Sequence, residues 1–126
     1  MKKIINTTKA PAPIGPYNQA ILSGNTLYIS GQIPLNPETG KLVEGDIKKE
    51  TRQSMENLKV ILEEAEMNFE NVVKSSIFLS DMNQFTQVNE VYATYFEAET
   101  APARETVEVA NLPKFVNVEI SMIAVK

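Results

Sequence analysis

Arg104 and Glu119 carry the charges best suited to chemistry in a chain of 126 residues that contains no histidine and no cysteine. Both lie in residues 101–125, APARETVEVANLPKFVNVEISMIAV, where apolar and polar residues alternate as in two strands. An arginine binds a carboxylate through two parallel hydrogen bonds, and a glutamate can hold or deprotonate a nearby water. Together they suit the hydrolysis of a small acid. The same pattern also fits two charges that lie on a solvated sheet face or pair with each other.

The distance between the two charges depends on how these strands are arranged. In a simple hairpin with Ala110 opposite Phe115, Thr106 faces Glu119, and Arg104 is a diagonal neighbour about 7 to 8 Å away. Such a gap fits a small substrate. If another strand lies between the two, the distance is larger, and the sequence leaves both arrangements open.

Four other residues are candidates for contacts with a ligand. Tyr17 follows a Gly-Pro pair, and the proline stiffens the loop that presents the ring. Ser30 and Gly31 end an apolar run, where a glycine lets a ligand approach backbone groups. Asn89 lies on a predicted helix. Each also has an ordinary explanation, as part of a turn, a strand exit or a solvated helix face, so none is decisive alone.

Composition excludes several classes of function. The net charge is -4 and the pI about 4.9, and the lysines are dispersed, so nucleic acid is not an expected partner. Without cysteine or histidine, disulfides, thiolate nucleophiles, imidazole bases and nearly all zinc sites are excluded. The N-terminal residues lack the apolar core of a signal peptide, and no run approaches the ~20 apolar residues of a membrane span. We therefore expect a cytoplasmic protein with no membrane partner.

Periodicity predicts the elements that must hold the candidate residues. Strands are expected at 3–6, 18–22, 26–30, 71–80, 104–110 and 115–125, and helices at 47–67 and from 81 or 83 to about 96. Gly24-Asn25 fits the tight turn of a hairpin, and Asp46 is a candidate N-cap for the first helix. Residues 31–45, with two prolines and three glycines, are expected to form a loop.

This order predicts one α+β domain, 1–126, in which two helices pack on one face of a mixed sheet. The other face has no element to cover it. In the last predicted strand, Ile123 and Val125 have the opposite parity to the core positions, so part of the second face is apolar. We therefore expect burial against other subunits in a closed ring.

Five motifs in order resemble the RidA family of reactive-intermediate imine and enamine deaminases. They are IGPYNQA (14–20), SGQIPLNPETG (30–40), NVVKSSIFLSDMNQFTQVNEVYATYF (71–96), APARETVEVANLP (101–113) and VEISMIAV (118–125). Together they span nearly the whole chain. The resemblance implies a chorismate-mutase-like fold and a homotrimer with ligand sites between subunits.

The resemblance also implies a reaction and roles for the candidates. Arg104 would bind the substrate carboxylate and Glu119 would position the attacking water. The pocket would be completed by Tyr17, Ser30, Gly31, Asn89 and Thr106. The implied substrates are 2-iminobutyrate and 2-iminopropionate or their enamine tautomers such as 2-aminoacrylate, which yield 2-oxo acids and ammonia. No metal or organic cofactor is implied.

One departure from the family pattern concerns the residues after the arginine. Many members have Ser-Cys there, whereas this chain has Glu105-Thr106. In a regular strand Glu105 points away from the face that carries Arg104.

A regulatory or chaperone-like trimer that binds a small carboxylate without catalysis is the alternative function, since Arg104 alone would suffice for it. An endoribonuclease is a third reading, which the acidic charge and the lack of histidine disfavour.

Overall fold

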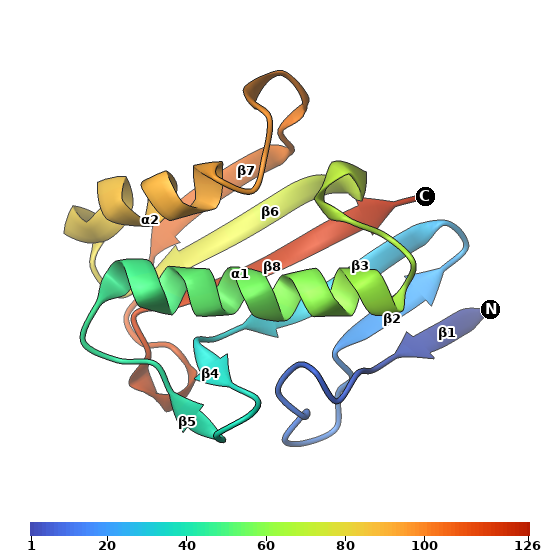
Figure 1. Cartoon of the computed structure of the whole chain (residues 1–126), viewed down its shortest axis with the longest axis horizontal. Coiled ribbons are helices and arrows are strands. Elements are labelled where there is room, and N and C mark those ends of the chain that lie inside the picture. The colour runs from blue at the N-terminus through green and yellow to red at the C-terminus, as the bar shows by residue number, and fades with distance from the viewer.

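The computed structural model describes residues 1–126 and contains a six-stranded mixed sheet (Figure 1). In spatial order the strands are β1 (Lys2–Ile5), β2 (Ala20–Ser23), β3 (Thr26–Gln32), β8 (Val118–Val125), β6 (Val72–Leu79) and β7 (Ala103–Glu108). All neighbours are antiparallel except β6 and β7. The expected β2–β3 hairpin is present, and of its turn residues only Gly24 has a positive φ, of 59°.

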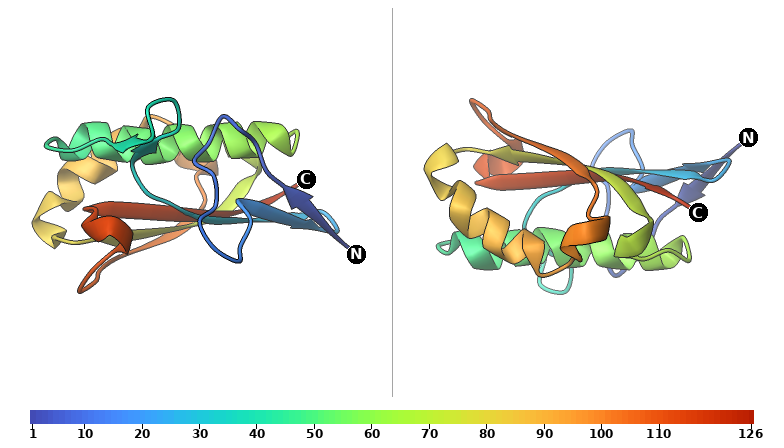
Figure 2. Two further views of the ribbon diagram at one scale, coloured as in Figure 1. Left: turned by 90° about the horizontal axis from the view of Figure 1, so that it is seen from below. Right: turned by 90° about the horizontal axis from the view of Figure 1, so that it is seen from above.

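Two helices, α1 (Ile47–Glu64) and α2 (Phe85–Ala93), lie on the same side of the sheet (Figure 2). The core lies between them and the sheet, where Leu58 and Ile61 of α1 and Ile120 of β8 are fully buried. The prediction of an α+β fold with two helices on one face is therefore confirmed. Neither helix is long and apolar enough to span a membrane.

The residues 31–45 are not entirely irregular, because β4 (Leu35–Asn36) and β5 (Lys41–Leu42) pair within them. The buried amide of Asn57 on α1 donates to the backbone oxygens of Ile33 and Leu35, at 3.2 and 3.0 Å. This contact anchors the segment to the helix. Strands of two residues carry too little periodicity for a sequence pattern to reveal them.

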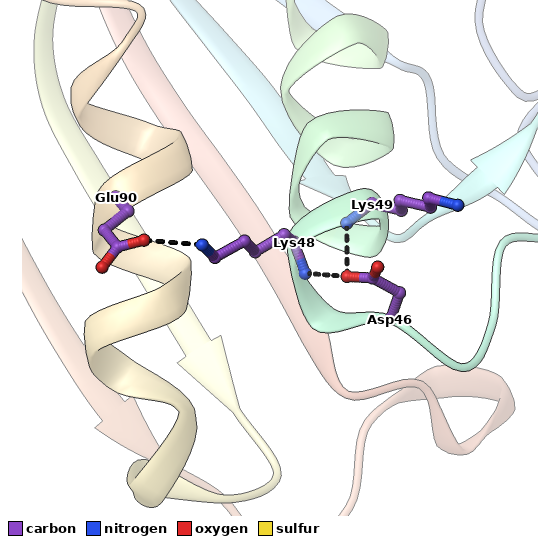
Figure 3. Close-up of polar contacts among 4 residues, drawn as sticks. All are labelled: Asp46, Lys48, Lys49 and Glu90. Atoms are coloured by element: carbon purple, nitrogen blue, oxygen red, sulfur yellow. Dashed lines mark hydrogen bonds and ion pairs between the residues drawn. The ribbon is translucent and has the colours of Figure 1, made fainter.

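Asp46 caps α1 as expected. Its Oδ1 accepts hydrogen bonds from the backbone nitrogens of Lys48 and Lys49 at 2.9 and 3.3 Å (Figure 3). The ammonium of Lys48 also forms an ion pair with Glu90 of α2 at 2.7 Å. Both side chains are exposed, and solvent screens such surface pairs, so this ion pair is expected to contribute little to stability. The cap fixes where α1 begins, and the ion pair links the two helices.

Replacing Asp46 with Ala should lower the free energy of unfolding by about 1 kcal/mol, because two first-turn amides lose their acceptor. Urea unfolding at one fixed protein concentration measures this change. Lys49→Ala is the matched control, since it removes an exposed side chain from the same turn and keeps the backbone donor. An Asp46→Ala protein as stable as the control would contradict the role of the cap.

The position of β8 decides where the candidate residues lie. Because the β6–α2–β7 unit makes β6 and β7 parallel, β8 pairs with the free edge of β6 and joins it to β3. The hairpin between the last two strands is therefore wrong, and the alternative with a strand between them is correct. Directly paired residues share a face. Arg104 pairs with Ser75 and Glu119 with Phe78, so the two charges lie on opposite faces of the sheet.

The face without helices, which we call the open face, exposes large apolar side chains. Ile4, Tyr28 and Val107 are 53%, 51% and 41% exposed, and the strand register places all three on this face. Isolated exposed apolar residues are common on proteins, but several on one sheet face indicate a surface suited to contact with another chain.

Candidate active site

Arg104 lies on the helix-covered side of β7, where α2 orients its side chain. Its Nη1 donates to Oδ1 of Asn89 at 2.6 Å. Its guanidinium carbon lies 5.1 Å from the centre of the Tyr92 ring and 5.6 Å from that of Phe85. Asn89, Tyr92 and Phe85 lie on the same helix, so α2 supplies all three contacts. The guanidinium forms no ion pair, and its remaining N–H groups can bind a carboxylate.

The Tyr92 ring is itself held in place. Its hydroxyl donates to Oγ of Ser75 on β6 at 2.9 Å, and both residues are buried. Burial raises the pKa of the phenol, so the hydroxyl stays protonated. Arg104 therefore packs against a ring that is attached to the sheet.

Thr106 points to the same face as Arg104, two residues along β7, and its register partner is Ile77. Its hydroxyl is buried and has no hydrogen-bond partner within the chain. The sequence expectation that Arg104 and Thr106 share a face is thus met. An unpaired buried hydroxyl carries a free-energy cost that a polar ligand or partner group could relieve.

Glu105 points to the open face, as the alternation predicted. Its carboxylate forms an ion pair with Lys74 at 2.9 Å and accepts a hydrogen bond from Ser76. The hydrogen bond from Lys74 holds the pKa of Glu105 below its ordinary value. Both partners lie on β6, so Glu105 is paired away from Arg104 and does not compete for the guanidinium.

Beside Arg104 the surface is hollowed to a volume of about 430 Å³, which we call the α2 hollow. Its lining comes from α2, the following turn and the start of β7, and consists of Asn89, Tyr92, Ala93, Phe96, Ala98, Ala101, Pro102 and Arg104. Arg104 is the only charged residue in this lining. The hollow thus joins one cation to mainly apolar walls.

Glu119 lies on the open face, in a second cavity of about 430 Å³ that we call the Glu119 hollow. Tyr17, Ser30 and Gly31 contribute to its lining, together with Pro113 and Lys114. The carboxyl group is half-buried and has no hydrogen-bond partner in the chain, and burial raises its pKa above the ordinary value. A desolvated carboxylate of this kind is a stronger base than one in water.

Gly31 makes room for the Glu119 carboxylate. The pairing of β3 with β8 is irregular between Ile29 and Gln32, and Gly31 lies in this bulge. A Cβ at Gly31 would lie 2.5 Å from Oε2 of Glu119 and 2.7 Å from its carboxyl carbon. The glycine is thus required for close approach and not for an unusual backbone conformation, since its φ is not in the left-handed region.

Tyr17 reaches the same hollow from a loop that bends at Gly15, where φ is 118°. The Tyr17 hydroxyl accepts from the backbone nitrogen of Ile14 at 3.3 Å, and the residue is 51% exposed. Ser30 donates to the backbone oxygen of Asn18 at 2.7 Å, which holds the loop against β3. Ser30 therefore already has an acceptor within the chain.

Gln19 was not predicted as a site residue, and it holds the end of the loop that carries Tyr17 against residues 7–11. Its side chain is 2% exposed and donates to the backbone oxygens of Thr7, Ala10 and Pro11, at 3.0, 3.3 and 2.9 Å. Its presence within the motif IGPYNQA was the only available signal. Pro113 and Lys114 were also missed as lining residues, because they lie in a turn before β8 and not in a strand.

The candidate residues therefore form two groups within one chain. Arg104, Asn89 and Thr106 gather on the helix-covered side of β7, whereas Tyr17, Ser30, Gly31 and Glu119 gather on the open face. The linings of the two hollows share no residue.

A family model described as Endoribonuclease L-PSP matches residues 7–126. This chain belongs to that family, the RidA family. A RutC family protein of Pyrococcus horikoshii is 56% identical over 126 residues, which cover 100% of this chain and 99% of the relative. A mouse relative named 2-iminobutanoate/2-iminopropanoate deaminase is 50% identical and covers 100% of this chain and 93% of its own.

Solved structures of similar chains share the fold. A putative endoribonuclease from Thermotoga maritima has a TM-score of 0.96 and 50% identity, covering 100% of this chain and 98% of the other. The structure of Escherichia coli TdcF with bound serine has a TM-score of 0.92 and 42% identity, covering 98% of each chain. The resemblance inferred from the five motifs is thereby confirmed at the level of family and fold.

Proposed function

We propose that this protein hydrolyses reactive 2-imino and 2-enamino acids to 2-oxo acids and ammonia. The observation that carries the proposal is an arginine without an ion-pair partner, oriented by Asn89 and two aromatic rings, in a chain that also holds a half-buried, unpaired glutamate. The name of the mouse relative supports the same reaction. The substrates proposed are 2-iminobutyrate and 2-iminopropionate.

The proposal requires a second copy of the chain, because Arg104 and Glu119 lie on opposite faces of one sheet. We propose a homotrimer in which the open faces pack together and each site lies between two copies. One copy supplies Arg104, Asn89 and Thr106, and its neighbour supplies Glu119 and the other residues of the Glu119 hollow. The exposed apolar residues of the open face favour such an assembly.

In the proposed mechanism, the substrate carboxylate binds Arg104 and places the C=N carbon beside Glu119 of the neighbouring copy. An enamine first takes up a proton at carbon and becomes the protonated imine. The Glu119 carboxylate accepts a proton from water as the water oxygen bonds to C2, which gives a carbinolamine. The protonated Glu119 then returns its proton to nitrogen. Ammonia leaves as the C–N bond breaks, the hydroxyl gives its proton to the Glu119 carboxylate and the C=O bond forms. The protonated imine is already electrophilic, so positioning and a basic carboxylate supply the catalysis.

A competition assay tests this function. A threonine dehydratase generates 2-iminobutyrate in the presence of semicarbazide, and the protein competes with the trap for the imine. We expect the wild type to suppress semicarbazone formation and Glu119→Gln, which keeps the size of the side chain but cannot accept a proton, to lose the effect. Full suppression by Glu119→Gln would exclude the assigned role.

A small-carboxylate-binding trimer without catalysis is the second candidate function. The Escherichia coli TdcF structure holds a bound serine, so a relative binds a small amino acid, which favours this reading. Calorimetric binding of 2-oxobutyrate by a protein that does not compete with semicarbazide would establish it. Arg104→Ala should abolish that binding in either case.

A further inference from the structure

The α2 hollow is charged at one end and mainly apolar elsewhere, and the proposed reaction gives a role only to the charged end. Arg104 forms one end, and the rest of the wall is made by the methyl groups of Ala93, Ala98 and Ala101, the ring of Pro102 and two aromatic rings. Asn89, the other polar residue, already accepts from Arg104. A ligand that fits this wall has a carboxylate at one end and an apolar group at the other.

The size of the α2 hollow also limits which side chains can fill it. Its volume of about 430 Å³ lies within the range of roughly 300–1,000 Å³ that small-molecule sites occupy. A two-carbon side chain would leave most of this apolar wall exposed to water. A branched or longer aliphatic side chain would cover more of it, and each additional methylene buried there strengthens binding through the hydrophobic effect.

We propose that the α2 hollow is the side-chain subsite for the acid whose carboxylate binds Arg104, and that it favours 2-imino acids with branched aliphatic side chains. This inference rests on the proposed function. In a 2-imino acid the side chain and the carboxylate are attached to the same carbon. A side chain must therefore lie close to Arg104, and Arg104 lines this hollow.

The same geometry disfavours acidic substrates. A second carboxylate placed along the alanine and proline wall would lose its hydration without gaining a cation, because Arg104 is the only charge in the lining. The subsite should therefore reject the imines of aspartate and glutamate while accepting that of leucine, which has a similar length. Selectivity then arises from the cost of the wrong substrate as well as from contacts with the right one.

The Glu119 hollow is the competing location for the side chain. It too has apolar walls, but it shares no lining residue with the α2 hollow and lies on the other face of the sheet. Filling each hollow separately distinguishes the two. Ala93→Leu reduces the α2 hollow from the last residue of α2, where leucine is a good helix former. Ala12→Leu is the matched change in the Glu119 hollow.

The experiment measures the ratio of kcat/KM for the leucine imine to that for the alanine imine, each generated by an amino-acid oxidase and trapped by semicarbazide. We expect wild type to prefer the leucine imine, and Ala93→Leu to lower this ratio about tenfold or more. Ala12→Leu should leave the ratio unchanged. Ala98→Leu, which fills the same hollow from the turn after α2, should repeat the result of Ala93→Leu if that variant folds poorly.

Two results would overturn the proposal: a ratio that falls in Ala12→Leu but not in Ala93→Leu, or one that changes in neither. If the protein hydrolyses no imine, the proposed function fails, but the subsite can still be tested by binding. Calorimetry then compares the affinity for 4-methyl-2-oxopentanoate with that for 2-oxobutyrate. Ala93→Leu should then weaken binding of the branched acid more than that of the short one. Equal weakening of both acids, or of neither, would again exclude the subsite.

Discussion

Arg104→Ala and Glu119→Gln chains, each inactive alone, are expected to recover about a quarter of wild-type activity when they are unfolded together in equal amounts and refolded. The reason is that the two charges lie on opposite faces of one sheet, and the proposed site combines Arg104 of one copy with Glu119 of another. A mixed assembly can restore that combination. Activity in the competition assay, before and after mixing, is the measurement.

The expected value follows from the symmetry of the proposed trimer. Random assembly places both kinds of chain in about three quarters of the trimers, and each of these contains one intact interface out of three, so roughly a quarter of all sites are complete. Each variant refolded alone is the control and should stay inactive while eluting at the size of the wild type. An inactive mixture of that same size would mean that both residues of a site belong to one chain.

Gly31→Ala is expected to lower kcat/KM about 100-fold, since displacing a catalytic group by about 1 Å can cost that much. The added Cβ would lie 2.5 Å from Oε2 of Glu119, so the carboxylate must move. The atoms that must move are the end of a flexible side chain, and the backbone at Gly31 suits an L-residue. We therefore expect a folded protein with nearly unchanged thermal stability and an impaired site.

The control for this prediction is calorimetric binding of 2-oxobutyrate to Gly31→Ala. If the substitution acts through Glu119, binding of the carboxylate by Arg104 should stay close to that of the wild type. Weakened binding would show that the glycine serves the ligand directly. Wild-type kinetics in Gly31→Ala would show that the Glu119 carboxylate can be displaced without consequence.

Local patterns in the sequence predicted what depends on local chemistry. The cap at Asp46, the helical periodicity of α1 and the opposite directions of Arg104 and Glu105 follow from neighbours within a few residues, and the structure has all three. Helix ends were less accurate, since α1 stops at Glu64 and not near residue 67.

Contacts between distant segments explain what the sequence could not reveal. The pairing of β8 with both β3 and β6 depends on which edges remain free once α2 has set β7 parallel to β6. To predict the role of Gly31, one must know the register of β3 against β8. To predict that of Gln19, one must know that residues 7–11 pass close to its side chain. No periodicity encodes such relations. The alternation of residues 101–125 therefore could not predict that the candidate residues lie on two different faces of the sheet.

The location of β8 also determines when the sheet can be completed during folding. This strand follows all the others in the chain but lies in the middle of the sheet, between β3 and β6. Until residues 118–125 have left the ribosome, the two parts of the sheet have no common strand, and both β3 and β6 present unpaired edges on which other chains can add. Sheet completion therefore requires residues 118–125 to be free to pair, and the same step places Glu119 beside Gly31.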